Sequence, residues 1–277
     1  MSDQGVPEPH PAPPPPPPPP PSLTPPPPPP FPGAMAPPPG YVSYGASAGG
    51  EFKRVRGVGK ALVALEAAGV ALTLLALGFQ SALAGPAQDF LDGAISQAAF
   101  DDEASSYRRL AGLSTLVTLA ALVVGIIWSY RIASNLRSLG RTITWKPGLT
   151  IAVWILGFCT LGIVNFLMFK EHWKASDPDV RPGDPSWTQR PSLPIITAWL
   201  ALTLLSAGVQ IAMGVATGRR ALNGFNGTDS ARTLAETAAN DLPLLAASGL
   251  LGAASTVVLI GIVRQLTQRH AQATIES

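Results

Sequence analysis

Five apolar segments separated by polar connections form the main pattern along the chain. The segments cover about residues 60–84, 110–136, 149–170, 194–216 and 242–264. A helix needs about 20 predominantly apolar residues to cross the roughly 30 Å hydrocarbon core of a bilayer, and each segment is long enough. The pattern therefore predicts an all-α fold, a polytopic helical membrane protein with its membrane domain over residues 58–270. Four segments are expected to span as two hairpins, with the third as a central re-entrant or fifth spanning segment.

The third segment is ambiguous because Gly157, Gly162 and Asn165 interrupt its apolar run. If it crosses the membrane with the N-terminus inside, the cytoplasmic loops and ends carry 11 of the 19 Lys and Arg residues. If it enters and returns on the cytoplasmic side, they carry 14. Because short cytoplasmic loops are enriched in Lys and Arg, we favour the re-entrant alternative and a cytoplasmic N-terminus in a cell membrane.

An internal repeat also favours two hairpins. The sequence Ala-Leu-Thr-Leu-Leu at residues 71–75 recurs at residues 201–205, and a glutamine follows at the same spacing in each copy, Gln80 and Gln210. Each copy is followed by a polar loop and then by an apolar segment that ends in Arg. Two hairpins of the same orientation require that the segment between them does not cross the membrane. Chance similarity between Ala- and Leu-rich helices is the alternative explanation.

Composition supports the membrane class and excludes others. Of the 277 residues, 47% are apolar and 13% are charged, which is too apolar for an ordinary soluble domain. The net charge is +2 and the basic residues lie between apolar segments, so nucleic-acid binding has no support. The single cysteine, Cys159, excludes an intramolecular disulfide and is predicted to be a buried, inert thiol. The polar N-terminus does not have the pattern of a cleavable signal peptide, so the first helix is expected to act as its own insertion signal.

The first 57 residues are predicted to be a disordered, proline-rich cytoplasmic tail. Residues 1–52 hold 22 of the 30 prolines, and such a chain favours an extended polyproline II conformation. Pro38-Pro39-Gly40-Tyr41 matches the Pro-Pro-x-Tyr pattern that WW domains bind, which makes the tail a candidate docking arm for a protein partner. A low-complexity spacer is the other interpretation. Residues 271–277 are expected to form a C-terminal tail.

Two polar connections are predicted to contain short helices. Residues 86–107 are acidic with apolar residues at helical spacing, which suggests a short interfacial helix. Residues 219–241 are expected to contain another, capped at Asp229 or Ser230.

Three polar residues lie inside the predicted spans: Glu66, Gln80 and Gln210. An acid within a membrane helix is costly unless it is paired, so Glu66 is a candidate functional residue. The alternative is a shallow glutamate that reaches the headgroups or pairs with a nearby basic residue. Isolated glutamines of this kind also occur simply as hydrogen-bonding partners of a neighbouring helix.

A second polar set lies near the predicted cytoplasmic boundary. Trp128, Arg131 and Asn135 fall at positions i, i+3 and i+7 of the second segment and therefore share one helix face. Glu171 and Trp173 follow the third segment. If that segment re-enters, Glu171 is expected to pair with Arg131 or Asn135 in a polar interfacial cluster with the tryptophans at headgroup level. His172, next to Glu171, is expected to be solvated.

In these residues the sequence resembles a bacterial, largely actinobacterial, family of membrane proteins known as domain of unknown function 4328. The resemblance covers about residues 60–268 and is carried by Trp128, Tyr130, Arg131, Asn135, Pro147-Gly148, Trp154, Glu171, Trp173, Ala175 and Ser176. Gly157 stands where the family usually has a proline. The resemblance implies a membrane location, this helical architecture and a proline-rich tail, and it implies no reaction.

The sequence favours a non-enzymatic membrane protein, an interaction or scaffold module with a proline-rich docking arm. The alternative is a small transporter or channel component that uses the intramembrane polar residues. No metal-binding, phosphate-binding or nucleophile motif occurs, so we predict no catalytic residue, cofactor or metal. The expected partners are the lipid bilayer and a protein that binds the tail. Oligomeric state does not follow from the sequence.

Overall fold

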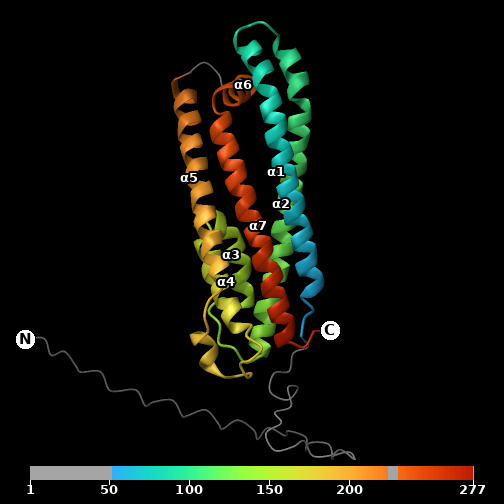
Figure 1. Cartoon of the computed structure of the whole chain (residues 1–277), viewed down its shortest axis with the longest axis vertical. Helices are drawn as coiled ribbons and strands as arrows, with labels where there is room; N and C mark the ends of the chain where they lie inside the picture. Colours follow the sequence, from blue (N-terminus) through green and yellow to red (C-terminus); the bar gives the residue numbers. More distant parts are fainter. Residues whose placement is uncertain (1–51, 224–229, 277) are drawn as a thin grey trace, which may run out of the picture. The chain divides into compact units, whose positions relative to one another are not determined.

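The computed structural model describes residues 52–223 and 230–276 as a bundle of helices (Figure 1). Its elements in chain order are α1 (Arg56–Leu91), α2 (Gln97–Ser138), α3 (Pro147–Cys159), α4 (Ile163–Ala175), the 3₁₀-helix η1 (Pro185–Gln189), α5 (Pro194–Asn223), α6 (Ser230–Asn240) and α7 (Leu242–Ala273). The described ranges contain no β-strand, and the all-α prediction is confirmed. The proline-rich segment of residues 1–51, including the motif at residues 38–41, lies outside the described residues.

Four helices, α1, α2, α5 and α7, are long and apolar enough to cross a membrane, which supports a multi-pass membrane protein. They form the two expected hairpins, because α1 packs along α2 and α5 packs along α7. Contacts between α1 and α7 join the hairpins into one bundle. Outward-facing apolar side chains such as Leu116 and Phe158 are 65% and 70% exposed, as expected for a surface that contacts lipid tails instead of water.

The first hairpin is longer than predicted. α1 has 36 residues and α2 has 42, which correspond to about 54 and 63 Å and exceed the bilayer core. The prediction of a separate interfacial helix within residues 86–107 is wrong, because both long helices continue into that segment. The chain reverses between them at Gly93, which has φ +77°, and Ser96 Oγ caps α2 by accepting from the Ala99 N–H at 3.3 Å.

The helix expected between residues 219 and 241 is present as α6. It packs against the extended part of α1, and the two form an apolar cluster with the start of α2. We call this region the distal cap; its buried residues are Leu83, Ala87, Phe100, Ala104, Ala231, Ala235 and Ala238. Packing against α6 explains why the helices of the first hairpin extend past the hydrocarbon core.

The third apolar segment folds as a short helical hairpin and not as one continuous helix. α3 ends at Cys159 and α4 begins at Ile163, and Leu161 and Gly162 between them have φ values of +51° and +82°. These left-handed conformations reverse the chain. Each helix has 13 residues, about 20 Å, which is too short to cross a 30 Å core. Of the two alternatives left open by the sequence, the structure adopts the re-entrant one.

Cys159 is exposed, and the prediction of a buried thiol is wrong. It is the last residue of α3, next to the strongly exposed Phe158 at the hairpin tip. An apolar run can face lipid as well as protein, and here it faces outwards.

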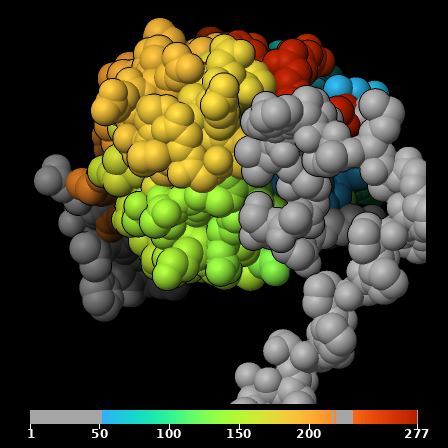
Figure 2. All heavy atoms as spheres, turned by 90° about the horizontal axis from the view of Figure 1, so that it is seen from below, coloured from blue at the N-terminus to red at the C-terminus, as the bar shows by residue number. Residues whose placement is uncertain are grey.

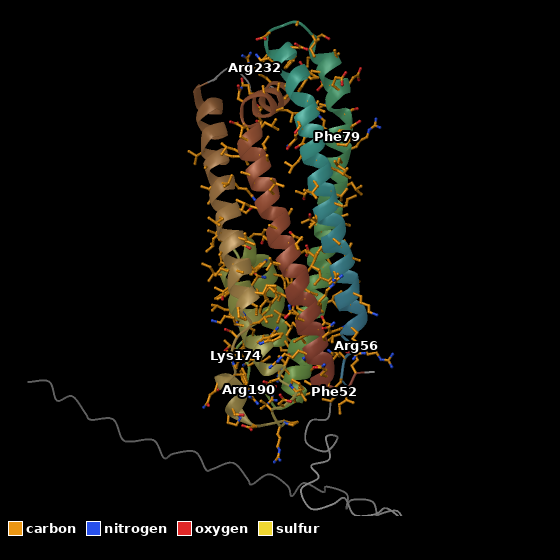
Figure 3. All side chains as sticks on the ribbon, in the orientation of Figure 1. Phe52, Arg56, Phe79, Lys174, Arg190 and Arg232 are labelled. Carbon is orange, nitrogen blue, oxygen red and sulfur yellow. The ribbon has the colours of Figure 1, made fainter. Side chains whose placement is uncertain are left out.

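One end of the bundle carries most of the Lys and Arg residues, 14 of 19. We call it the polar end; α1 begins there, and α2, α4 and α7 end there (Figure 1). Figure 2 views this end from below, with the α2–α3 connection, the segment between α4 and α5, and the end of α7 covering it. Figure 3 shows Arg56, Lys174 and Arg190 at the polar end and Arg232 at the opposite end.

Candidate functional site

Side chains of α2 hold the segment that leads into α1. Asn135 is 1% exposed and pairs with the backbone of Lys53 in both directions, since Oδ1 accepts from the Lys53 N–H at 2.8 Å and Nδ2 donates to the Lys53 carbonyl at 2.8 Å. One turn earlier, Arg131 Nη1 donates to the Arg54 carbonyl at 2.8 Å. The shared helix face predicted for Arg131 and Asn135 is therefore used to bind backbone.

The C-terminal segment holds the next two residues, Val55 and Arg56. The carboxylate of Glu276 accepts from the backbone N–H groups of Val55 and Arg56 at 3.0–3.1 Å. The first N–H groups of a helix lack partners within the helix and favour a negative charge, which is what Glu276 supplies to α1. Residues 52–56, which we call the arm root, are thus fixed by side chains from both α2 and the C-terminal segment.

Glu171 does not form the expected pair with Arg131 or Asn135. Its Oε1 accepts from the Thr144 N–H at 2.8 Å and its Oε2 from the Trp145 N–H at 3.0 Å. These bonds join the end of α4 to the residues just before α3 and close the base of the re-entrant hairpin. The expectation fails because Glu171, Arg131 and Asn135 each form hydrogen bonds with backbone groups that lie close to them in the fold. The sequence does not show which backbone groups these are.

The two tryptophans of the predicted cluster have different environments. Trp128 is fully buried, donates from Nε1 to Thr267 Oγ1 at 3.0 Å and packs edge-on against Phe169. It is therefore a core residue of the α2–α4–α7 contact and not a headgroup anchor. Trp173 is partly exposed, and the guanidinium of Arg269 lies 4.4 Å from its ring centroid.

Arg269 also belongs to an ion-pair cluster that the sequence did not indicate. Asp177 Oδ2 lies 2.7 Å from Arg269 Nη2 and 3.1 Å from Arg190 Nε, and the Asp177 side chain is only 6% exposed. The cluster ties the loop after α4 to the end of α7. Nothing in the spacing of these three residues predicts it, because they come together only through the chain reversal at residues 161–162.

Two buried histidines lie behind Asn135. His270 Nε2 is 3.2 Å from Asn135 Nδ2 and its Nδ1 is 2.9 Å from Ser176 Oγ. Because an amide nitrogen can only donate, Nε2 accepts and Nδ1–H of the neutral ring donates to Ser176. This network was not identified from the sequence, because its members are separated by 135 and 94 residues in the sequence.

His172 is fully buried, and the expectation of a solvated residue is wrong. Neither ring nitrogen has a hydrogen-bond partner in the described structure. Burial lowers the pKa of His172 to about 4; the nearby Trp145 backbone acts in the opposite direction, without a hydrogen bond of normal geometry. The ring is therefore neutral at pH 7. His172 follows Phe169 by three residues and Met168 by four, so it lies on the same, buried face of α4. This spacing is visible in the sequence.

Within the apolar part of the bundle lies a cavity of about 420 Å³ between α1, α2, the α3–α4 hairpin, α5 and α7. Its polar lining includes Glu66, Trp154, Asn165, Trp199, Thr203, Ser206, Gln210 and Ser255. The tip of the re-entrant hairpin, with Gly157, Leu161 and Gly162, forms part of its wall. Trp154 and Asn165 come from the hairpin, and the other polar groups of this lining come from the spanning helices α1, α5 and α7.

Most polar groups of the cavity bond to each other or to the bundle. Trp154 Nε1 donates to Ser129 Oγ at 2.8 Å, and Thr203 Oγ1 lies 2.9 Å from Ser255 Oγ. In the described structure the Glu66 carboxyl and the Asn165 amide have no hydrogen-bond or ion-pair partner. Asn165 is only 6% exposed, and it lines the cavity.

The three intramembrane polar residues do not form one site. Glu66 and Gln210 both line the cavity, and Gln210 Nε2 donates to Ser206 Oγ at 3.3 Å. Gln80 lies near the distal cap, where Nε2 donates to the Tyr107 hydroxyl at 2.8 Å. The matching glutamines of the repeat therefore have different surroundings.

On the α5 side of the cavity, only Gln210 was singled out from the sequence, although a signal for the other residues was present. The cavity-lining residues Trp199, Thr203, Ser206 and Gln210 recur at intervals of four, three and four residues. This spacing puts them on one helix face in an otherwise apolar helix. A polar stripe of this kind indicates an inward-facing surface.

The described residues contain no group of three or more His, Cys, Asp or Glu side chains suited to hold a metal ion. Comparisons with models of known protein families, with curated proteins and with solved structures found no match. The resemblance noted from the sequence therefore remains a prediction, and the site must be interpreted from its own geometry.

Proposed function

We propose that this is a non-enzymatic membrane protein whose helical bundle presents a proline-rich docking arm at one face of the bilayer. The observation that carries the proposal is the fixation of the arm root by Asn135, Arg131 and Glu276. A tail that acts only as a spacer does not need a fixed position where it leaves the helical bundle. A docking arm gains from one, because a fixed origin raises the effective concentration of the arm near its partner.

We further propose that the polar end faces the cytoplasm. Fourteen of the 19 Lys and Arg residues belong to the polar end and the segments that lead to it in the re-entrant topology. Such an excess is typical of cytoplasmic loops. The arm would then meet cytoplasmic partners.

The test is affinity purification of the full-length protein from solubilised membranes, in three forms. The first is the unchanged chain, the second has the order of residues 1–51 scrambled, and the third carries Tyr41→Ala. We expect a partner that is enriched on the unchanged chain, lost with the scrambled arm and reduced with Tyr41→Ala. The purified partner should then bind the purified full-length protein directly. Equal recovery on the unchanged and scrambled forms would contradict the docking role.

The cavity favours a second candidate function, a small transporter or channel component for cations. The Glu66 carboxyl, which has no partner among the described residues, supplies an acidic group, and the rings of Trp154 and Trp199 line the same space. Aromatic faces and carboxylates both attract cations, and the Asn165 amide oxygen offers a further acceptor. An acid without a basic partner within a membrane helix is a functional candidate in its own right.

Uptake into proteoliposomes tests this second function, with sodium, potassium and methylammonium ions as probes. We expect uptake above that of protein-free vesicles and a loss of uptake in Glu66→Gln. Gln80→Leu is the matched control, because Gln80 lies outside the cavity. Equal uptake of all three cations by empty and protein-loaded vesicles would reject the function.

A further inference from the structure

A groove of about 890 Å³ lies between the first turns of α1 and the last turns of α7, at the polar end. Three cationic side chains line it, Arg56 and Lys60 from α1 and Arg264 from α7, together with the amides of Gln268 and Gln272. We infer that this groove binds an anionic phospholipid, with the phosphate on the three cations and an acyl chain along the apolar wall.

Within residues 52–223 and 230–276, the three cations have no acidic partner. None of them takes part in an ion pair in the described structure. The carboxylate of Glu276, an acid at this end, is bound to the backbone N–H groups of Val55 and Arg56. Like charges that converge on one groove repel each other, and a bound phosphate would relieve this repulsion through charge-assisted hydrogen bonds.

The apolar part of the groove continues from the cations towards the hydrocarbon core. Val63, Ala64 and Ala67 form it, and Ala67 lies about 10 Å along α1 from Lys60. Gly59 allows α1 and α7 to approach closely at its floor, since a Cβ there would lie 2.6 Å from Thr267 Oγ1. Small side chains below a basic rim suit a molecule that is anionic at one end and apolar at the other. Basic pockets of this type between membrane helices bind anionic headgroups.

Native mass spectrometry of the full-length protein after mixing with defined lipids tests the inference. The probes are phosphatidylglycerol and phosphatidylcholine of the same chain length. We expect one phosphatidylglycerol to be retained in preference to phosphatidylcholine. In the triple variant Arg56→Gln, Lys60→Gln, Arg264→Gln, retention should fall about tenfold or more, given roughly 1 kcal/mol per basic residue near an anionic lipid.

The matched control is Arg137→Gln, Lys146→Gln, Arg181→Gln. All three residues are exposed and none lines the groove; Arg137 lies in the last turn of α2, Lys146 just before α3 and Arg181 after α4. Each triple variant removes three positive charges. Equal retention by the two triple variants would overturn the inference. So would equal retention of the two lipids by the unchanged protein.

A further pair of experiments tests the apolar wall and the source of the phosphate. Ala64→Trp and Ala67→Trp fill the groove without changing charge, and both positions are exposed, so the fold should tolerate them. They should lower phosphatidylglycerol retention. Soluble glycerol phosphate should not displace the lipid at a comparable concentration. Displacement by glycerol phosphate, or unchanged retention in both tryptophan variants, would mean that the acyl chain contributes nothing and would overturn the lipid assignment.

Discussion

The side-chain amide of Asn135 forms two hydrogen bonds with the backbone of Lys53, accepting from its N–H and donating to its carbonyl, each at 2.8 Å. Eighty-two residues separate the two partners in the sequence. The amide imitates a backbone pairing and fixes the chain at the point where the proline-rich arm joins the bundle. Only Asn or Gln offers a donor and an acceptor in this arrangement, and Gln is longer by one methylene.

We therefore expect Asn135→Ala to release the arm root. Both Lys53 backbone groups lose their partners, at a cost of about 1–3 kcal/mol in the free energy of unfolding. Trypsin should cleave after Lys53 and Arg54 faster than in the unchanged protein, and the melting temperature should fall. The control is Asn240→Ala, which removes an exposed bond to the Glu236 carbonyl within α6. Equal rates of cleavage in the unchanged protein and Asn135→Ala would contradict the clamp.

The tip of the re-entrant hairpin depends on Gly157. A Cβ at this position would lie 2.2 Å from Asn165 Oδ1, so Gly157→Ala must displace the Asn165 side chain. We expect a loss of about 1–3 kcal/mol in the free energy of unfolding, typical of overpacking. Asn165→Ala removes the clash, so the double variant should be more stable than the sum of the two single changes predicts.

Gly78→Ala is the matched control for this cycle. Nothing lies within 4 Å of a Cβ at Gly78, and a helical Ala is favoured over Gly by roughly 1 kcal/mol. Thermal unfolding in detergent should show this variant to be unchanged or more stable. Additive effects of Gly157→Ala and Asn165→Ala would show that the two positions do not contact each other.

The hydropathy pattern was sufficient to locate every membrane helix, because a bilayer requires long apolar runs wherever a helix crosses it. It did not predict where α1 and α2 end, since their outer turns are amphipathic and are stabilised by packing against α6. Nor did it place the break in the third segment. Of the interrupting residues Gly157, Gly162 and Asn165, only Gly162 lies at the turn, next to Leu161, whereas Gly157 allows a close approach to the Asn165 side chain.

The candidate site was only partly predictable for a related reason. Helix periodicity correctly put Arg131 and Asn135 on one helix face. Two of the polar residues predicted within the membrane spans, Glu66 and Gln210, line the same cavity. Arg131 and Glu171 bind backbone groups of distant segments, and Asn135 binds the Lys53 backbone besides His270. The sequence does not show which backbone groups lie near a side chain. The tertiary pairing of these residues therefore required the structure.

Burial of His172 should make the stability of the protein depend on pH. Its pKa is about 4 in the folded state and 6.5 when unperturbed, so the unfolded chain binds a proton more readily. The contribution of His172 to the free energy of unfolding is complete above pH 6.5. It is lost as the pH falls towards 4, and the loss is at most about 3 kcal/mol. His172→Phe removes the titrating group and leaves the neighbouring His270 in place. Thermal unfolding between pH 7.5 and 4 should show a steeper loss of stability in the unchanged protein, and parallel curves would contradict this origin.

The re-entrant hairpin makes a direct prediction about which loops share a side of the membrane. On a Cys159→Ala background, single cysteines at Lys146 and Ser186, before α3 and after α4, should react with an impermeant maleimide from the same side. Cysteines at Glu103 and Arg232, in or beside the distal cap, should react only from the other side. Reaction of the first two from opposite sides would mean that the third segment crosses the membrane. If they share a side but react in intact cells, the hairpin stands and the polar end faces outwards, which would place the arm outside the cell.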